Sequence, residues 1–274
     1  MTGKKGDKQR KPSTSRKPSR AVPTSPNIDD FSAELKYAGN RSDLVNRIDR
    51  LYKVLEQLGL DETDRRLVEL GRGEKKNFAQ RLSTAVAQKI ADALRPDFPA
   101  ILPNADGRGH ESRSKGASGL KKIDVNYSLP RSGLELAISI KTINFKDEVT
   151  KRYTKNTKRV DGELRAEAED VHTRQPFAVL AAYLFLPVDA ATDGKASSLD
   201  HNAKTLVHRA GRVDTKNASS QIELAFIGLY SDDGHVAFYR PNMIPPHGVP
   251  SESMTFSQTL QEVRALHAKR NPRK

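Results

Sequence analysis

The sequence predicts an α/β fold in which a central mixed β-sheet is flanked by helices and preceded by an N-terminal helical region. Two observations indicate this fold. Apolar residues recur at three- and four-residue steps in several segments, as amphipathic helices require. Residues 177 to 187, "FAVLAAYLFLP", form a continuously apolar run, which is typical of a strand covered on both faces of its sheet.

Length and charge limit the kinds of protein that this sequence can encode. A chain of 274 residues is long enough for one substantial domain with a small helical appendage. The formal net charge is +13; residues 1 to 25 carry eight Lys and Arg against one Asp, or +7, which leaves 13 − 7 = +6 for the rest. A chain that is basic beyond its tail favours a polyanionic partner, with nucleic acid first and anionic membrane second.

The residue types that are missing exclude several classes of site. The sequence contains no cysteine and no tryptophan. Disulfide scaffolds, thiolate zinc sites and cysteine nucleophiles are therefore excluded. No apolar run approaches the roughly 20 residues of a membrane span, and the N-terminal residues lack the apolar segment of a signal peptide. We expect a soluble, cytoplasmic protein with no membrane partner.

The N-terminal part of the chain divides into an arm and a helical region. Residues 1 to 27 are rich in Lys, Arg, Ser and Pro, which predicts a disordered basic arm, either a solubilising tail or a tether to DNA. Residues 28 to 72 form the predicted helical region. Its main helix begins at Ser42 and ends at Gly59, and its apolar stripe suits either its own core or a partner helix across a dimer. A short second helix is predicted from Asp64 to Leu70.

The remaining residues, 73 to 274, are predicted to form the main domain. A longer helix has Phe78 and Leu82 on its apolar stripe and ends at Pro96, because proline interrupts helical hydrogen bonding. Residues 96 to 120 are predicted to be a long loop, which is uncommon in a compact domain and often functional. The later elements are expected as strands within 121–142, a basic loop over 144–158, a helix over 160–174, the apolar strand at 177–187, a helix near 198–212, strands at 222–230 and 235–240, and a short basic C-terminal helix.

The segment "KKIDVNYSLPRSGLELAISIKT", residues 121 to 142, predicts a hairpin that carries polar residues on one face. If its turn pairs Leu129 with Leu134, then Asp124 lies opposite Ser139. A solvent-exposed sheet face is one interpretation. A functional site is the other, because small residues such as Ala137 and Ser139 leave room for a ligand. The side chains expected on this face are Asp124, Asn126, Glu135, Ser139 and Lys141.

This hairpin resembles the active-site hairpin of the PD-(D/E)xK nucleases, the fold of most type II restriction endonucleases. Asp124 matches the aspartate of the motif and Lys141 its lysine, whereas Ile123 replaces the proline and Ser139 replaces the second acid. The order of predicted elements between residues 74 and 187 is also that of the family core. The resemblance implies a restriction-endonuclease-like core over residues 73 to 274.

The resemblance implies an Mg²⁺-dependent endonuclease that hydrolyses phosphodiester bonds in double-stranded DNA. It further implies a homodimer for double-strand cutting and a bacterial restriction or phage-defence role, with other defence-system subunits as possible partners. A repair or junction-resolving nuclease stays open within the same fold. Lys141 would orient or deprotonate the attacking water, or compensate charge on the phosphate; the second role does not require a lowered lysine pKa.

Ser139 leaves the expected metal site one carboxylate short, because a hydroxyl cannot supply the missing negative charge. One branch of restriction enzymes keeps such a serine and takes a glutamate from the helix after the lysine strand. At the spacing which that branch uses, this chain has Thr154 and Lys155, and neither is an acid. The first acids on the following helix are Glu163 and Glu167. The candidates to join Asp124 as metal ligands are, in order, Glu74, Glu167, Glu135 and Glu111, with Glu74 also a candidate catalytic residue beside Asp124, Ser139 and Lys141. Helical spacing places Glu167 nearer the buried stripe of its helix than Glu163.

Basic residues after the hairpin predict a DNA-binding segment. They could clamp phosphates, or form a solvated loop without a role. His172 and Arg174 could touch DNA or complement a helix dipole, and His201 and His208 would suggest a histidine-metal nuclease if further ligands supported them. The residues expected to bind DNA are Lys151, Arg152, Tyr153, Lys155, Lys158 and Arg159.

Two further functions stay open from the sequence. Ser139 favours a non-catalytic DNA-binding or assembly subunit with a degenerate nuclease fold. A basic RNA-binding module is the other, although aromatic residues, which stack on bases in such modules, make up only 6% of the chain.

Overall fold

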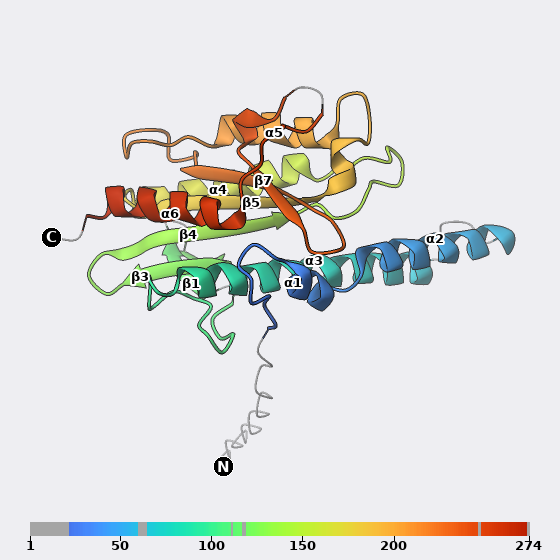
Figure 1. Cartoon of the computed structure of the whole chain (residues 1–274), viewed down its shortest axis with the longest axis horizontal. Helices are drawn as coiled ribbons and strands as arrows, with labels where there is room; N and C mark the ends of the chain where they lie inside the picture. Colours follow the sequence, from blue (N-terminus) through green and yellow to red (C-terminus); the bar gives the residue numbers. More distant parts are fainter. Residues whose placement is uncertain (1–21, 60–64, 111, 117–118, 246–247, 273–274) are drawn as a thin grey trace, which may run out of the picture.

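The computed structural model describes residues 22–59, 65–110, 112–116, 119–245 and 248–272. Its centre is a five-stranded mixed sheet in the order β3-β4-β5-β6-β7. The three inner strands run parallel, and both edge strands pair antiparallel. This arrangement confirms the predicted α/β fold with a central mixed sheet (Figure 1). The strands are β3 (Val125–Leu129), β4 (Gly133–Thr142), β5 (Val179–Pro187), β6 (Leu224–Tyr230) and β7 (Val236–Tyr239).

Helices cover both faces of this sheet. On one face α1 (Ser32–Ala38), α3 (Arg65–Leu94) and α6 (Phe256–Arg270) contribute apolar side chains to one buried cluster. On the other face α4 (Thr157–Arg174) and α5 (Ser198–Arg209) contribute to a second cluster (Figure 1). The central strand β5 is buried at all nine positions, as its continuous apolar run predicted. Two short 3₁₀ helices follow β5 and β7, at Val188–Ala191 and Pro241–Met243.

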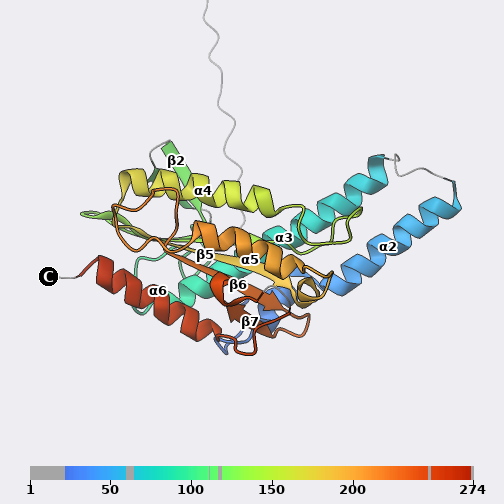
Figure 2. The ribbon, with the colours of Figure 1, turned by 90° about the horizontal axis from the view of Figure 1, so that it is seen from above.

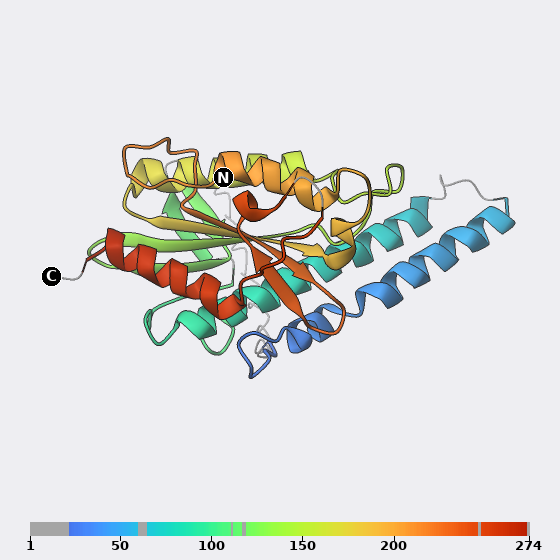
Figure 3. The same cartoon turned by 45° about the horizontal axis from the view of Figure 1, so that its top comes forward.

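A helical arm projects from one end of the sheet. It consists of α2 (Arg41–Gln57) and the N-terminal part of α3, which lie side by side beyond the strands (Figures 2 and 3). The Asn40 side chain, rather than Ser42, caps α2 by accepting the Asp43 N–H at 3.0 Å. The apolar stripe of α2 packs on its own chain, since Leu44 and Ile48 belong to the core cluster.

The structure corrects the two helices expected between residues 64 and 96. Instead of a short helix followed by a longer one, α3 is a single helix of 30 residues that continues through Gly71 and Gly73. The boundary expected between residues 72 and 73 falls inside it. Packed structure also begins earlier in the chain than expected, within the predicted arm. Ser25, within the predicted arm, is buried and its N–H donates to Glu34 Oε1 at 2.9 Å. Residues 1–21 of that arm lie outside the described residues.

The segment expected to be a long loop, residues 96 to 120, contains one strand and the start of another. β1 (Ser112–Gly116) and β2 (Gly119–Ile123) form a separate antiparallel pair. The following hairpin differs from the expected register at its turn. Asn126 pairs with Ala137 as predicted, but Leu129 pairs with Gly133, because a bulge shifts the register between Tyr127 and Ser128.

No helix within the described ranges is long and apolar enough to cross a membrane.

Candidate functional site

The candidate site begins where the β3–β4 ladder ends. The last pair of this ladder is Val125 with Ile138, and β4 continues to Thr142 beyond it. Asp124 is the single residue between β2 and β3, and its Oδ2 accepts a hydrogen bond from the Ile140 backbone N–H at 2.7 Å. The carboxylate thus takes over the hydrogen bond of a backbone donor that a longer β3 would have used. On this edge the end of β4 therefore lies beside a pocket instead of β3, whereas its other edge still pairs with β5 as far as Thr142.

This pocket has a volume of about 470 Å³ and lies between α3 and α4, over the end of β4. It brings together the two residues that matched the nuclease motif, because Asp124 and Lys141 both line it. Ser139 lines the same pocket, as expected from its place in the hairpin. The other polar residues around it are Lys76, Gln80 and Ser83 from α3, Arg159, Glu163 and Glu167 from α4, and Lys122 and Thr142 from the strands.

Lys141 is held by two glutamates of α4. Its Nζ donates to Glu167 Oε1 at 2.6 Å and lies 3.3 Å from Glu163 Oε2. Burial by itself lowers the pKa of Lys141, but the negative charges of Glu167, Glu163 and Asp124 outweigh it and raise this pKa above its ordinary value of 10.5. Lys141 is therefore protonated at neutral pH, which suits a role in charge compensation and not that of a general base.

The spacing of residues along α4 explains why these glutamates reach the pocket. Leu164, Ala168 and Val171 are buried against the sheet, as predicted. Glu163 and Glu167 are one turn apart on the margin of this stripe. The prediction that Glu167 lies nearer the sheet is confirmed, because its side chain is 24% exposed against 38% for Glu163.

Ser139 contributes a buried hydroxyl to the pocket. The residue is 4% exposed, and within the described residues its Oγ has no hydrogen-bond partner. A buried hydroxyl without a hydrogen bond costs about 1–3 kcal/mol. Since Ser139 lines the pocket, a water molecule or a polar ligand in the pocket would remove this cost.

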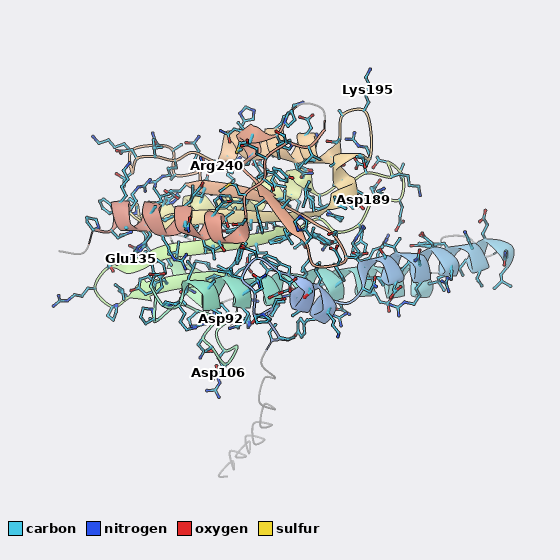
Figure 4. All side chains as sticks on the ribbon, in the orientation of Figure 1. Asp92, Asp106, Glu135, Asp189, Lys195 and Arg240 are labelled. Atoms are coloured by element: carbon cyan, nitrogen blue, oxygen red, sulfur yellow. The ribbon has the colours of Figure 1, made fainter. Side chains whose placement is uncertain are left out.

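Two of the expected metal ligands lie elsewhere, and that part of the prediction is wrong. Glu135 Oε2 is 3.1 Å from His267 Nε2 of α6, because the bulge turns Glu135 out of the expected alternation. It also lies four residues before Ser139, which is about 13 Å along the strand. Figure 4 shows Glu135 near the turn between β3 and β4, at the other end of the sheet from Asp189.

Glu74, the first-ranked acid, faces α2 instead of the pocket. Its Oε1 lies 2.9 Å from Arg47 Nη2, and both residues line a separate groove with Phe78. The reason is helical spacing: Glu74 shares the face of Phe78, whereas the pocket is lined by Lys76, Gln80 and others of the adjacent face. Glu111, the last-ranked candidate, lies outside the described residues.

The remaining acids do not form a chelating cage by themselves. Among the described residues, no three Asp, Glu, His or Cys side chains are gathered closely enough to hold a metal ion. The Lys141 ammonium occupies a position beside the α4 carboxylates. Mg²⁺ commonly binds through one or two carboxylates, several waters and a substrate phosphate. Asp124 and Glu167 line the pocket with the Ser139 hydroxyl, which has no hydrogen-bond partner in the described part of the chain. They fit an ion that keeps water and substrate ligands better than one held by protein groups alone.

The aromatic member of the expected DNA-binding segment is a structural residue. Tyr153 is 1% exposed, and its hydroxyl donates to Asp189 Oδ2 at 2.7 Å and accepts from Arg41 Nη1 at 3.1 Å. Burial, and the charge and hydrogen bond of Asp189, raise the pKa of Tyr153 despite the opposing Arg41. A residue enclosed in this way cannot stack on a base, so the expected DNA contact is wrong for Tyr153.

The basic members of that segment fall into two groups. Arg152 interacts with the Ala196 carbonyl and Asp193, Lys155 lies 2.6 Å from Asp147 Oδ2, and Arg159 lies 2.5 Å from Glu163 Oε1. Lys151 and Lys158 are exposed and do not line the pocket. Only Arg159 lines the pocket itself, so the segment as a whole is not gathered around Asp124.

His172 is also structural: it is buried, and its Nε2 lies 3.1 Å from Glu223 Oε2. The pocket residues that sequence reasoning missed include three on α3. Lys76, Gln80 and Ser83 line the pocket at helical spacing, one face away from the apolar stripe. The spacing itself is visible in the sequence, but only the packing of α3 beside β4 gives it significance.

Comparison with protein-family models, with curated proteins and with solved structures finds no match to this chain. Its function must therefore be inferred from the chemistry of this pocket.

Proposed function

We propose that the protein is a magnesium-dependent endonuclease that hydrolyses phosphodiester bonds in double-stranded DNA. One observation carries the proposal: Asp124, Ser139, Lys141 and Glu167 line a single pocket at the end of a β-ladder. Acids, a protonated lysine and a hydroxyl together suit a phosphate and its divalent cation. The match of Asp124 and Lys141 to the nuclease motif supports the same reaction.

Asp124 and Glu167 would hold the cation. When bound, Mg²⁺ stabilises negative charge that develops on the transferring phosphoryl group. Asp124 is well suited to this role because its Oδ2 is oriented by the Ile140 N–H, which holds the carboxylate at the pocket. Glu167 is 24% exposed and reaches the pocket from α4, so it can exchange its lysine partner for another cation.

Lys141 would neutralise the phosphate. Its ammonium has three donors, and Glu167 and Glu163 supply acceptors only from the α4 side. A phosphate oxygen in the pocket would accept another of them. The raised pKa keeps the charge in place through neutral pH. The Ser139 hydroxyl, which can both donate and accept, would position a water molecule or a phosphate oxygen beside it.

The biological setting is proposed from the resemblance alone. We propose a bacterial restriction or phage-defence nuclease that acts as a homodimer because two strands must be cut, with other defence-system subunits as further partners.

One observation favours a second function. No three ligating side chains are gathered among the described residues, and Lys141 already pairs with two of the acids. A degenerate pocket of this kind would suit a DNA-binding or assembly subunit that does not cleave.

The experiment that decides between them is incubation of the full chain with plasmid and phage DNA, with Mg²⁺ or with EDTA. We expect cleavage that requires the metal. Lys141→Ala and Glu167→Gln should each lower its rate by about 100-fold or more, as the loss of a charge at a phosphoryl site does. Glu169→Gln is the matched control, because Glu169 is a half-exposed glutamate of α4 that pairs with Arg165 and does not line the pocket.

The outcomes are distinct. Cleavage that survives in both pocket variants would place the reaction elsewhere in the molecule. Binding to every DNA without cleavage of any would support the assembly subunit, and preferential salt-dependent retention of RNA would support an RNA-binding module.

A further inference from the structure

We propose that Arg72 and Lys76, on α3, hold backbone phosphates of the DNA on one side of the candidate site. Neither residue belongs to the basic segment that the sequence indicated. The inference rests on the proposed function and describes how the substrate lies. Its basis is a second hollow, here called the α3 trough, that continues from the pocket.

The α3 trough has a volume of about 590 Å³ and lies between α3 and the segment from Thr142 to Arg159. Lys76, Ala79, Thr142 and Arg159 line both the trough and the pocket. The two hollows are therefore neighbours, and a chain bound across the pocket can extend into the trough.

The charge of the trough differs from that of the pocket. Seven Lys and Arg side chains line the trough against two acids, Asp147 and Glu148, which gives 7 − 2 = +5. Four Lys and Arg line the pocket against three acids, which gives 4 − 3 = +1. Asp189, Asp193 and Glu163, which do not line the trough, offset three of its charges, so the attraction for a polyanion depends on the cations that have no such partner.

Most cations of the trough already have a carboxylate partner. Five pairs account for them: Lys75 with Glu148, Lys146 with Asp189, Arg152 with Asp193, Lys155 with Asp147, and Arg159 with Glu163. The other two, Arg72 and Lys76, are exposed and form no ion pair with any described residue. A phosphate bound to these two displaces counterions only and breaks no existing pair.

Helical geometry arranges Arg72 and Lys76 in a row. Arg72 and Lys76 are one turn apart, which is about 6 Å along the axis, so they can contact separate phosphates. The same face of α3 continues through Gln80 to Ser83 in the pocket, about 16 Å from Arg72. The row leads from the reaction centre outward along the arm, which gives the backbone one direction of exit.

The test measures binding without cleavage. A fluorescent duplex of about 30 base pairs, an arbitrary length of roughly three helical turns, is titrated with the full chain in EDTA across a series of salt concentrations. The variants are Arg72→Ala with Lys76→Ala and, as a matched control, Arg50→Ala with Lys53→Ala. The control removes the same charge from exposed positions of the same arm outside the trough.

Two lost phosphate contacts should reduce the slope of log K against log salt by about 1.8, which corresponds to about 60-fold weaker binding at 0.1 M salt. The control pair should change the slope little. An unchanged slope in the trough variant, or an equal change in the control, overturns the proposal. A larger effect on RNA of the same length overturns the assignment of DNA as the partner.

Failure of this inference is separable from failure of the proposed function. If the trough variant binds DNA as the wild type does and still shows metal-dependent cleavage, the nuclease is supported and the trough is rejected. If the wild type does not cleave DNA but the trough variant shows the reduced salt slope, the trough is supported and the nuclease is rejected.

Discussion

The candidate site and the cluster around Glu223 both consist of ion pairs next to the same sheet, but they differ in how fully their atoms are used. Glu223 Oε1 accepts from Arg212 at 2.7 Å and Arg270 at 3.1 Å, and Oε2 accepts the Leu180 N–H at 2.9 Å beside His172. The Glu223 side chain is 0% exposed. In the candidate site, by contrast, Glu167 is partly exposed.

This difference separates a structural cluster from a site that can bind. Around Glu223 both carboxylate oxygens have donors from four segments, so the cluster joins these segments. Although Glu223 borders a smaller hollow, its side chain is closed to a ligand because it is 0% exposed. The candidate site has a hydroxyl without a partner among the described residues and a lysine that can exchange acceptors. Ionisable residues in a partly open hollow are therefore better functional candidates than a more deeply buried network.

The largest effect on stability should come from Glu223→Gln. The amide cannot neutralise Arg212 and Arg270, and removal of one partner from a buried pair costs about 3–5 kcal/mol because the other charge stays buried. Urea unfolding at neutral pH measures the loss. A loss below about 1 kcal/mol, the range of surface ion pairs, would mean that this cluster is no more structural than the candidate site.

The pH dependence of stability should also differ between wild type and that variant. Burial by itself raises the pKa of Glu223, but His172, the Leu180 N–H and Arg212 together lower it below the ordinary value of 4.5. Since the folded-state pKa is the lower one, this carboxylate stabilises the fold above about pH 4.5, and the contribution disappears as the pH falls through the folded-state pKa.

Thermal unfolding of wild type and Glu223→Gln from pH 6 to pH 3 measures this contribution. The difference in melting temperature between them should narrow as the pH falls. A constant difference over the whole range would show that the carboxylate charge is not what stabilises the cluster.

The smallest effect on stability should come from Glu167→Gln, the variant that we expect to abolish most of the cleavage. Lys141 keeps Glu163 at 3.3 Å, and the lost pair is partly exposed, so the free energy of unfolding should change by no more than about 1 kcal/mol. Urea unfolding under the same conditions checks this value. A loss as large as that of Glu223→Gln would remove the contrast between the two regions.

The sequence alone was sufficient to predict those features that local periodicity decides. The burial of β5 follows from its apolar run, and the inward stripe of α4 follows from the spacing of Leu164, Ala168 and Val171. The same spacing predicted that Glu167 lies nearer the sheet than Glu163. Asp124 and Lys141 were also identified correctly as neighbours of one pocket, because residues of a short hairpin keep close to one another.

Only the tertiary structure decided which other residues join them. A bulge of one residue turns Glu135 toward His267. Glu74 pairs with Arg47 because it lies on the face of α3 that contacts α2. Neither contact can be predicted from a pattern of spacings. Tyr153 is buried because Arg41, Asp189 and the 144–153 segment meet in space although they are distant in the chain. Periodicity specifies which side of an element is apolar, whereas the identity of the element that covers each side depends on long-range packing.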